Sequence, residues 1–101
     1  MTELNLCKEI SDAMVKMGFS EKAVEDYKTS SQYVTAYNSS APIQRTMLIM
    51  YFYTKLMSGS EMVPRNIRIG LNAATDSLVW YEDLVGIVLP FLRANQDRFY
   101  P

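Results

Sequence analysis

The stretch IRIGLNAATDSLVWYEDLVGIVLPFL, residues 67–92, decides the predicted fold of this chain of 101 residues. Its apolar residues recur at alternating intervals of four and three, the spacing of a helical heptad seam. They are Ile67, Leu71, Ala74, Leu78, Tyr81, Val85, Val88 and Leu92. A seam that keeps its phase over this length predicts one long helix, at about 64–94, whose apolar face something must cover.

Pro90 lies inside this predicted helix. It has no N–H, so the carbonyl four residues earlier, that of Gly86, loses its usual partner. Both residues fall in the polar wedge of the helix, where water can replace the lost hydrogen bond. We therefore expect a kink near Gly86, with the helix continuing to about residue 94.

Three shorter helices are predicted ahead of it, at about 3–17, 20–37 and 42–58. No stretch shows the alternation at period two that marks a strand. The predicted fold class is therefore all-α: one domain over 1–101, a small four-helix bundle of three shorter helices and one long C-terminal helix.

Local signals support the ends of these helices. Thr2 and Ser20 are suited to cap the first two, and Gly18 to end the first in the left-handed conformation. Residues 95–101 are expected to form a flexible tail, from which Phe99 and Tyr100 can dock elsewhere.

The segment 42–58 is apolar almost all round. Only Gln44, Arg45 and Lys55 form a polar side. A helix of this kind is typical of the middle of a bundle, so we expect the other helices to surround it.

Composition excludes several classes of function. The hydrophobic fraction of 49% is that of a folded globular protein, and the net charge of −1 gives no global field for nucleic acid or anionic lipid. The longest apolar run, Thr46 to Thr54, is far shorter than the ~20 residues that span a bilayer. No secretory signal opens the chain, and the lone Cys7 lies on the predicted inner face of its helix. We expect a cytoplasmic protein with no membrane contact and a reduced, buried thiol.

The residues of catalytic and cofactor sites are scarce. The chain has no histidine, which removes serine and cysteine triads and the usual mixed zinc sites. No glycine-rich phosphate loop or acidic calcium loop occurs. The adjacent carboxylates Glu25-Asp26 and Glu82-Asp83 point about 100° apart on a helix and do not converge. The sequence predicts no enzyme, cofactor or metal site.

The C-terminal half of the long predicted helix has more apolar surface than one seam needs. We expect Leu78, Tyr81, Val85 and Val88 to be core. The second seam supplies the candidate contacts to a partner protein, which are Trp80, Leu84, Ile87 and Phe91. The competing interpretation is that the chain's own helices cover this face.

These observations predict a protein that acts by binding another protein. We expect a small adaptor, inhibitor or immunity-type accessory protein, of the kind found in phages and mobile elements, that forms a dimer through the last helix. Arg65 and Arg68 are candidates for the rim of that contact. The alternatives are a nucleic-acid-binding regulator that uses Arg45, Arg65 and Arg68, and a small-ligand pocket lined by Tyr51, Tyr53 and Trp80.

Overall fold

The computed structural model describes residues 5–59, 61–65, 67 and 81–101. The helices in these ranges are α1 (Leu6–Lys16), α2 (Glu21–Thr29), α3 (Ser31–Tyr37), α4 (Ala41–Met57), the π-helical η1 (Leu84–Val88), α7 (Leu89–Ala94) and α8 (Gln96–Phe99). No strand occurs in the same ranges, which confirms the all-α class there. The finer prediction, a four-helix bundle with one long last helix, is not confirmed, because the last described helices are short.

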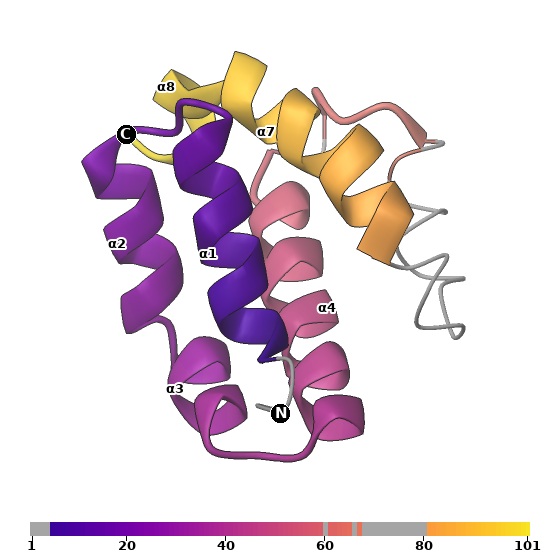
Figure 1. Cartoon of the computed structure of the whole chain (residues 1–101). Helices are drawn as coiled ribbons and strands as arrows, with labels where there is room; N and C mark the ends of the chain where they lie inside the picture. Colours follow the sequence, from indigo (N-terminus) through magenta and orange to yellow (C-terminus); the bar gives the residue numbers. More distant parts are fainter. Residues whose placement is uncertain (1–4, 60, 66, 68–80) are drawn as a thin grey trace.

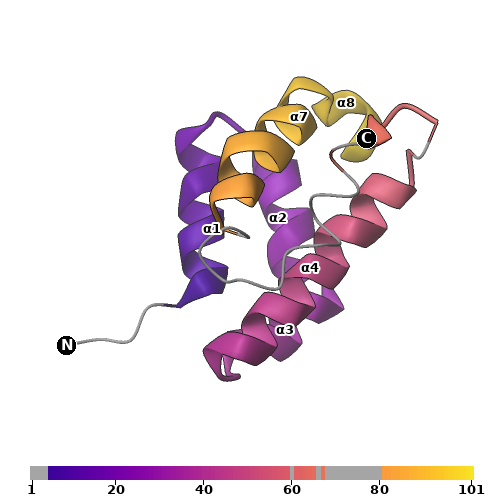
Figure 2. The same cartoon turned by 90° about the vertical axis from the view of Figure 1, so that its right-hand side faces the viewer.

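The described helices form a group that the C-terminal helices cross at one end. α1, α2 and α4 run alongside one another, and the short α3 joins α2 to α4 at the lower end of Figure 1. η1, α7 and α8 cross the opposite end of α1, α2 and α4 (Figures 1 and 2). The C-terminus therefore lies beside the turn that joins α1 to α2, far from the start of α4.

Side-chain caps fix the ends of the first two helices. Asn5, which the sequence did not single out, caps α1 by accepting hydrogen bonds from the amides of Cys7 (3.0 Å) and Lys8 (3.3 Å). The predicted cap Thr2 lies outside the described residues. Gly18 follows α1 with a φ of +87°, as predicted, and Ser20 caps α2 by accepting from the amide of Ala23 at 3.1 Å.

The segment predicted as one helix over 20–37 is two helices, because the chain turns at Ser30. Its backbone is extended, with φ −64° and ψ 149°. Its hydroxyl donates to the carbonyl of Tyr27 at 2.7 Å and accepts from the amide of Tyr33 at 3.1 Å. A serine side chain that competes for backbone groups in this way ends α2 and caps α3.

α4 matches the predicted segment 42–58 to within one residue at each end, but it does not lie in the middle of a bundle. One side of it is buried and consists of Gln44, Leu48, Tyr51, Phe52 and Leu56. The other side is exposed to solvent, and Met50 there is 47% exposed. The prediction of a surrounded helix is wrong because α1, α2, α3 and the C-terminal segment all pack near one side of α4.

The sequence places Gln44 on the polar side of this helix, whereas the structure buries it. It is 4% exposed. Its side-chain oxygen accepts from the amide of Leu6 at 3.0 Å, and its side-chain nitrogen donates to the carbonyl of Ser39 at 3.1 Å. These hydrogen bonds satisfy a buried amide and tie the start of α1 to the start of α4.

The described part of the last helical segment runs without interruption from 81 to 94, through Gly86 and Pro90. At the place of the predicted kink the chain makes a π-helical turn over Leu84–Val88, in which the amide of Leu89 donates to the carbonyl of Leu84. Pro90 has no N–H for the carbonyl of Gly86, so the wider turn accommodates the proline. The part of the predicted long helix at 66 and 68–80 lies outside the described residues.

Residues 95–101 are not a flexible tail. α8 forms there, and Phe99 and Tyr100 are 3% and 6% exposed. Two hydrogen bonds join this end of the chain to the turn between α1 and α2. The side chain of Arg93 donates to the carbonyl of Met17 at 2.9 Å, and the amide of Ser20 donates to the side-chain oxygen of Gln96 at 2.7 Å.

Tyr27 is the centre of the core formed by the first four helices. It is fully buried on α2. Its hydroxyl donates to the carbonyl of Cys7 on α1 at 3.0 Å. Its ring lies 4.9 Å from that of Tyr33 on α3, and 5.4 Å and 5.7 Å from those of Tyr51 and Phe52 on α4, between ring centroids. One side chain therefore contacts three other helices.

Tyr27→Phe is expected to lower the free energy of unfolding by about 1 to 2 kcal/mol, because it removes one buried hydrogen bond and keeps the ring. Tyr27→Ala is expected to cost about 3 to 5 kcal/mol, because it also empties the aromatic centre. Urea unfolding followed by circular dichroism measures both. Equal losses for the two variants would contradict the central role of the ring.

Candidate binding surface

The exposed side of α4 is an apolar stripe of regular spacing. Ile43 and Met50 are each 47% exposed, Met57 is 39% exposed, and Met47 is half-buried. Together with the exposed Thr54, they follow one another at intervals of four and three, the spacing of a heptad seam. Tyr53, 36% exposed, flanks the stripe. We call this side of α4, with Ile43, Met47, Met50, Tyr53 and Thr54 as its defining residues, the α4 face.

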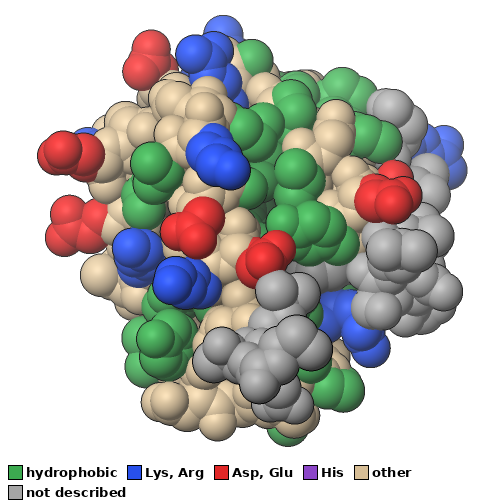
Figure 3. Space-filling model, in the orientation of Figure 1, with side chains coloured by type: hydrophobic (Ala, Val, Ile, Leu, Met, Phe, Trp, Pro, Cys, Tyr) green, Lys and Arg blue, Asp and Glu red, His purple; other side chains and the backbone are tan. Residues whose placement is uncertain are grey.

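The α4 face has no charge. Every exposed residue of α4 is uncharged, and its two charged residues, Arg45 and Lys55, are half-buried. By contrast, all but one of the exposed residues of α2 are charged. The charged ones are Glu21, Lys22, Glu25, Asp26 and Lys28, and the uncharged one is Thr29. In the view of Figure 3, lysine, arginine and acidic side chains are spread over the side that carries α1 and α2. α4 therefore differs from an ordinary solvated helix.

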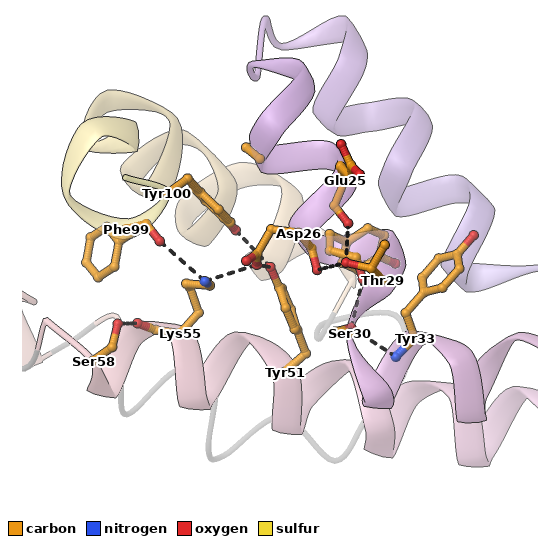
Figure 4. A network of polar contacts seen from close by, with 12 residues as sticks. Glu25, Asp26, Thr29, Ser30, Tyr33, Tyr51, Lys55, Ser58, Phe99 and Tyr100 are labelled. Atoms are coloured by element: carbon orange, nitrogen blue, oxygen red, sulfur yellow. Dashed lines mark hydrogen bonds and ion pairs between the residues drawn. The ribbon is translucent and has the colours of Figure 1, made fainter.

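An ion pair between α2 and α4 fixes which side of α4 faces outward. The Nζ of Lys55 lies 3.0 Å from the Oδ2 of Asp26. The hydroxyl of Tyr51, one turn earlier on α4, donates to the same oxygen at 2.6 Å (Figure 4). Because both α4 residues bind one carboxylate on α2, rotation of α4 about its axis would break both contacts.

The end of the chain completes this cluster. Lys55 donates to the carbonyl of Phe99 at 3.3 Å, and its Nζ lies 4.6 Å from the ring centroid of Tyr100. The hydroxyls of Tyr100 and Tyr51 are 3.3 Å apart (Figure 4). A charged amine near an aromatic face is attracted to it, so Lys55 joins α2, α4 and the C-terminal segment.

Burial changes the acidity of the two tyrosines. It raises the pKa of Tyr100 to about 12. It raises the pKa of Tyr51 as well, with Tyr100 and the hydrogen bond to Asp26 as further causes. Both phenols are therefore protonated over the physiological range and serve as hydrogen-bonding groups rather than as bases.

A pocket of about 270 Å³ opens beside the cluster. It is lined by Asp26, Ser30, Ser31, Gln32, Tyr51, Thr54, Lys55 and Ser58. Its one carboxylate is already bound to Lys55 and Tyr51. In the described ranges no three histidine, cysteine or acidic side chains gather as metal ligands would, so the pocket supplies no such set.

Those residues predicted to bind a partner that the structure describes differ in their exposure. Leu84 is fully buried, so the expectation that it is an interface residue is wrong for this fold. Phe91 is half-buried, with its ring 5.8 Å from that of Phe99. Ile87 is 45% exposed, and Trp80 lies outside the described residues. The π-turn and the docked Phe99 explain the difference, since neither follows from a regular helical wheel.

The residues predicted to form the core of the same segment are divided too. Val88 is buried as predicted, whereas Tyr81 and Val85 are half-buried. The hydroxyl of Tyr81 donates to Glu9 of α1 at 3.0 Å, so this residue fastens the segment at the edge of the core. Leu78 lies outside the described residues.

The described arginines and the described aromatic residues of the two alternatives lie apart. Arg45 is half-buried in the second turn of α4, whereas Arg65 is exposed on a segment beside the other end of α4. Arg68 lies outside the described residues. Tyr51 points to Asp26 (Figure 4), while Tyr53 is exposed two residues later, so these two do not line one pocket.

Sequence reasoning missed the α4 face although its signal is present. The spacing from Ile43 to Met57 is visible in the sequence, but the inner residues of the same helix are also apolar and hide it. Only the burial of Leu48, Tyr51 and Phe52 separates the two sides.

No protein-family model, curated protein or solved structure matches the chain. No helix in the described ranges is both long and apolar enough to cross a bilayer. The function must therefore be argued from the surface itself.

Tyr51→Phe is expected to lower the free energy of unfolding by about 1.5 to 3 kcal/mol at neutral pH, because a hydrogen bond to a carboxylate is lost. Urea unfolding measures the change. Tyr53→Phe is the matched control on the exposed side, and a change within about 0.5 kcal/mol is expected there. A similar loss in both variants would show that the Asp26 contact does not hold α4 in place.

The raised pKa values of Tyr51 and Tyr100 predict a loss of stability at high pH. An unfolded tyrosine has a pKa near 10, whereas that of Tyr100 in the folded protein is about 12. The stabilisation is complete below about pH 10 and is lost as the pH rises toward 12, because the unfolded chain releases the proton first. Urea unfolding across this range checks the slope, and Tyr100→Phe should make the slope shallower.

Proposed function

We propose that this chain is a non-enzymatic protein-binding module that docks a helix of its partner on the α4 face. The observation that supports this most directly is the absence of charge from every exposed residue of α4. Interface centres are depleted in charged residues and enriched in methionine and aromatic residues. An ordinary solvated helix has the opposite composition, as α2 does.

The spacing of the α4 face favours a helix as the bound element. Intervals of four and three on one helix form the holes that receive the side chains of a second helix lying alongside. Met47 and Met50 adapt to an irregular partner because the methionine side chain is flexible. Tyr53 adds apolar area with a polar tip at the edge.

A small adaptor, inhibitor or immunity-type accessory protein acts in this way, by occupying a surface of its target. The proposal assigns no chemistry to the chain, in keeping with the absence of histidine from the sequence. A cytoplasmic setting suits the buried, unpaired thiol of Cys7. The surface that we propose lies on α4 and replaces the predicted one on the last helix, since Leu84 is core.

A photo-cross-linking residue at position 50 tests the proposal. On irradiation in the native lysate it is expected to form adducts whose cross-linked peptides map to a helix, because Met50 is at the centre of the α4 face. The same residue at position 15 is the matched control. Val15 is 62% exposed on α1, on a helix whose exposed residues include the charged Asp12 and Lys16, and should give no such adduct.

Leu48→Ala and Met50→Glu establish that the face is a surface and not core. The first removes a fully buried side chain and should cost about 2 to 5 kcal/mol of stability. The second changes an exposed one and should stay within about 0.5 kcal/mol. The proposal fails if position 50 gives no adduct in a protein that remains folded, or if Met50→Glu unfolds the domain as Leu48→Ala does.

Nucleic-acid binding through Arg45, Arg65 and Arg68 makes a different prediction. It requires retention of DNA or RNA in a gel at low salt that weakens steeply as salt is added. We expect no such retention, because Arg45 is half-buried in the second turn of α4, whereas Arg65 lies eight residues after the end of α4. A salt-sensitive shift that disappears in Arg65→Gln would favour the regulator instead.

A further inference from the structure

We infer that the helix bound by the α4 face is α4 of a second copy of this chain, packed antiparallel about a two-fold axis near Met50. The inference rests on the proposed function, because it names the partner of that same surface. It concerns a different surface from the last helix, through which the sequence predicted a dimer.

The spacing of the stripe is nearly the same in both directions along the helix from Met50. Counted from Met50, its members lie seven and three residues before and four and seven residues after. When a second α4 is turned end for end about Met50, Met47 comes to lie level with Tyr53 of the other copy, one position from Thr54. Ile43 then meets the C-terminal end of the other helix. Two-fold packing requires such a self-complementary patch.

The charge distribution favours the same occupant. A residue at a two-fold axis meets its own copy, so a charged residue there would be opposed by a like charge. No exposed residue of α4 is charged, which removes this repulsion. The formal net charge of the chain is −1, so two copies approach without strong long-range repulsion.

The length of α4 limits the strength of the contact. Its 17 residues extend about 25 Å at 1.5 Å per residue. One helix against one helix covers less than the ~800 Å² per partner of a standard interface. We therefore expect a reversible dimer that forms at micromolar concentrations and not a permanent one.

Sedimentation equilibrium of the purified chain from about 1 to 500 µM tests the association. The wild type is expected to shift from monomer to dimer over this range. Met50→Lys should weaken the association about tenfold or more, and Val15→Lys, on α1, should leave it unchanged. A wild type that stays monomeric, or a dimer indifferent to Met50→Lys, overturns the inference.

Cysteine cross-linking tests the direction of packing, with Cys7→Ser in every variant. Mild oxidation of Met50→Cys should give a covalent dimer, because the two sulfurs meet at the axis. Ile43→Cys should not, because its copies would lie about 20 Å apart along the helices, beyond the reach of a disulfide. Equally fast cross-linking of both variants would indicate parallel helices and overturn the antiparallel arrangement.

Failure of this inference is distinguishable from failure of the proposed function. If the purified chain is monomeric but the cross-linker at position 50 captures a helix of another protein, the binding function stands and the second copy is wrong. If the chain is monomeric and position 50 captures nothing, both are wrong. Loss of the fold in Met50→Lys, measured by circular dichroism, also contradicts both.

Discussion

The arrangement of the first four helices depends on one buried side chain, Tyr27, whose ring is the aromatic centre of the core and whose hydroxyl donates to the carbonyl of Cys7. A buried phenol must find an acceptor, and this one is on α1. Its position directs the ring toward α3 and α4, where it contacts Tyr33, Tyr51 and Phe52. The hydroxyl and the ring of one side chain therefore connect three helices to α2.

This constraint also determines which side of α4 is available for binding. The aromatic contacts to Tyr27 and the polar contacts to Asp26 both come from Tyr51 and its neighbours, Phe52 and Lys55. All of these are on the inward side of the helix. The stripe through Met50 is on the other side of α4 and therefore faces outward. The contacts that Tyr51, Phe52 and Lys55 make on the inward side therefore leave this stripe exposed.

The sequence predicted what depends on local chemistry. The cap at Ser20, the left-handed end at Gly18 and the bounds of α4 follow from side chains within a few residues of one another. It failed where the chain departs from a regular helix or where the packing of distant elements decides. Ser30 ends α2 by bonding to Tyr27 and Tyr33, and Leu84 is buried in a π-turn that a regular wheel does not represent. The outward side of α4 was hidden for the same reason, because a helix that is apolar all round does not reveal which side its neighbours will cover.

The C-terminal segment and the proposed partner use different sides of α4. Phe99 and Tyr100 dock through Lys55 and Tyr51, and residues 50 and 51 of a helix point about 100° apart. A helix bound over Met50 therefore need not displace Tyr100 or break the ion pair to Asp26. Because binding and folding rely on separate contacts, the surface can change its composition, for example at Met50, with little effect on the core. This separation allows one small fold to present an uncharged helix face to a partner without unfolding.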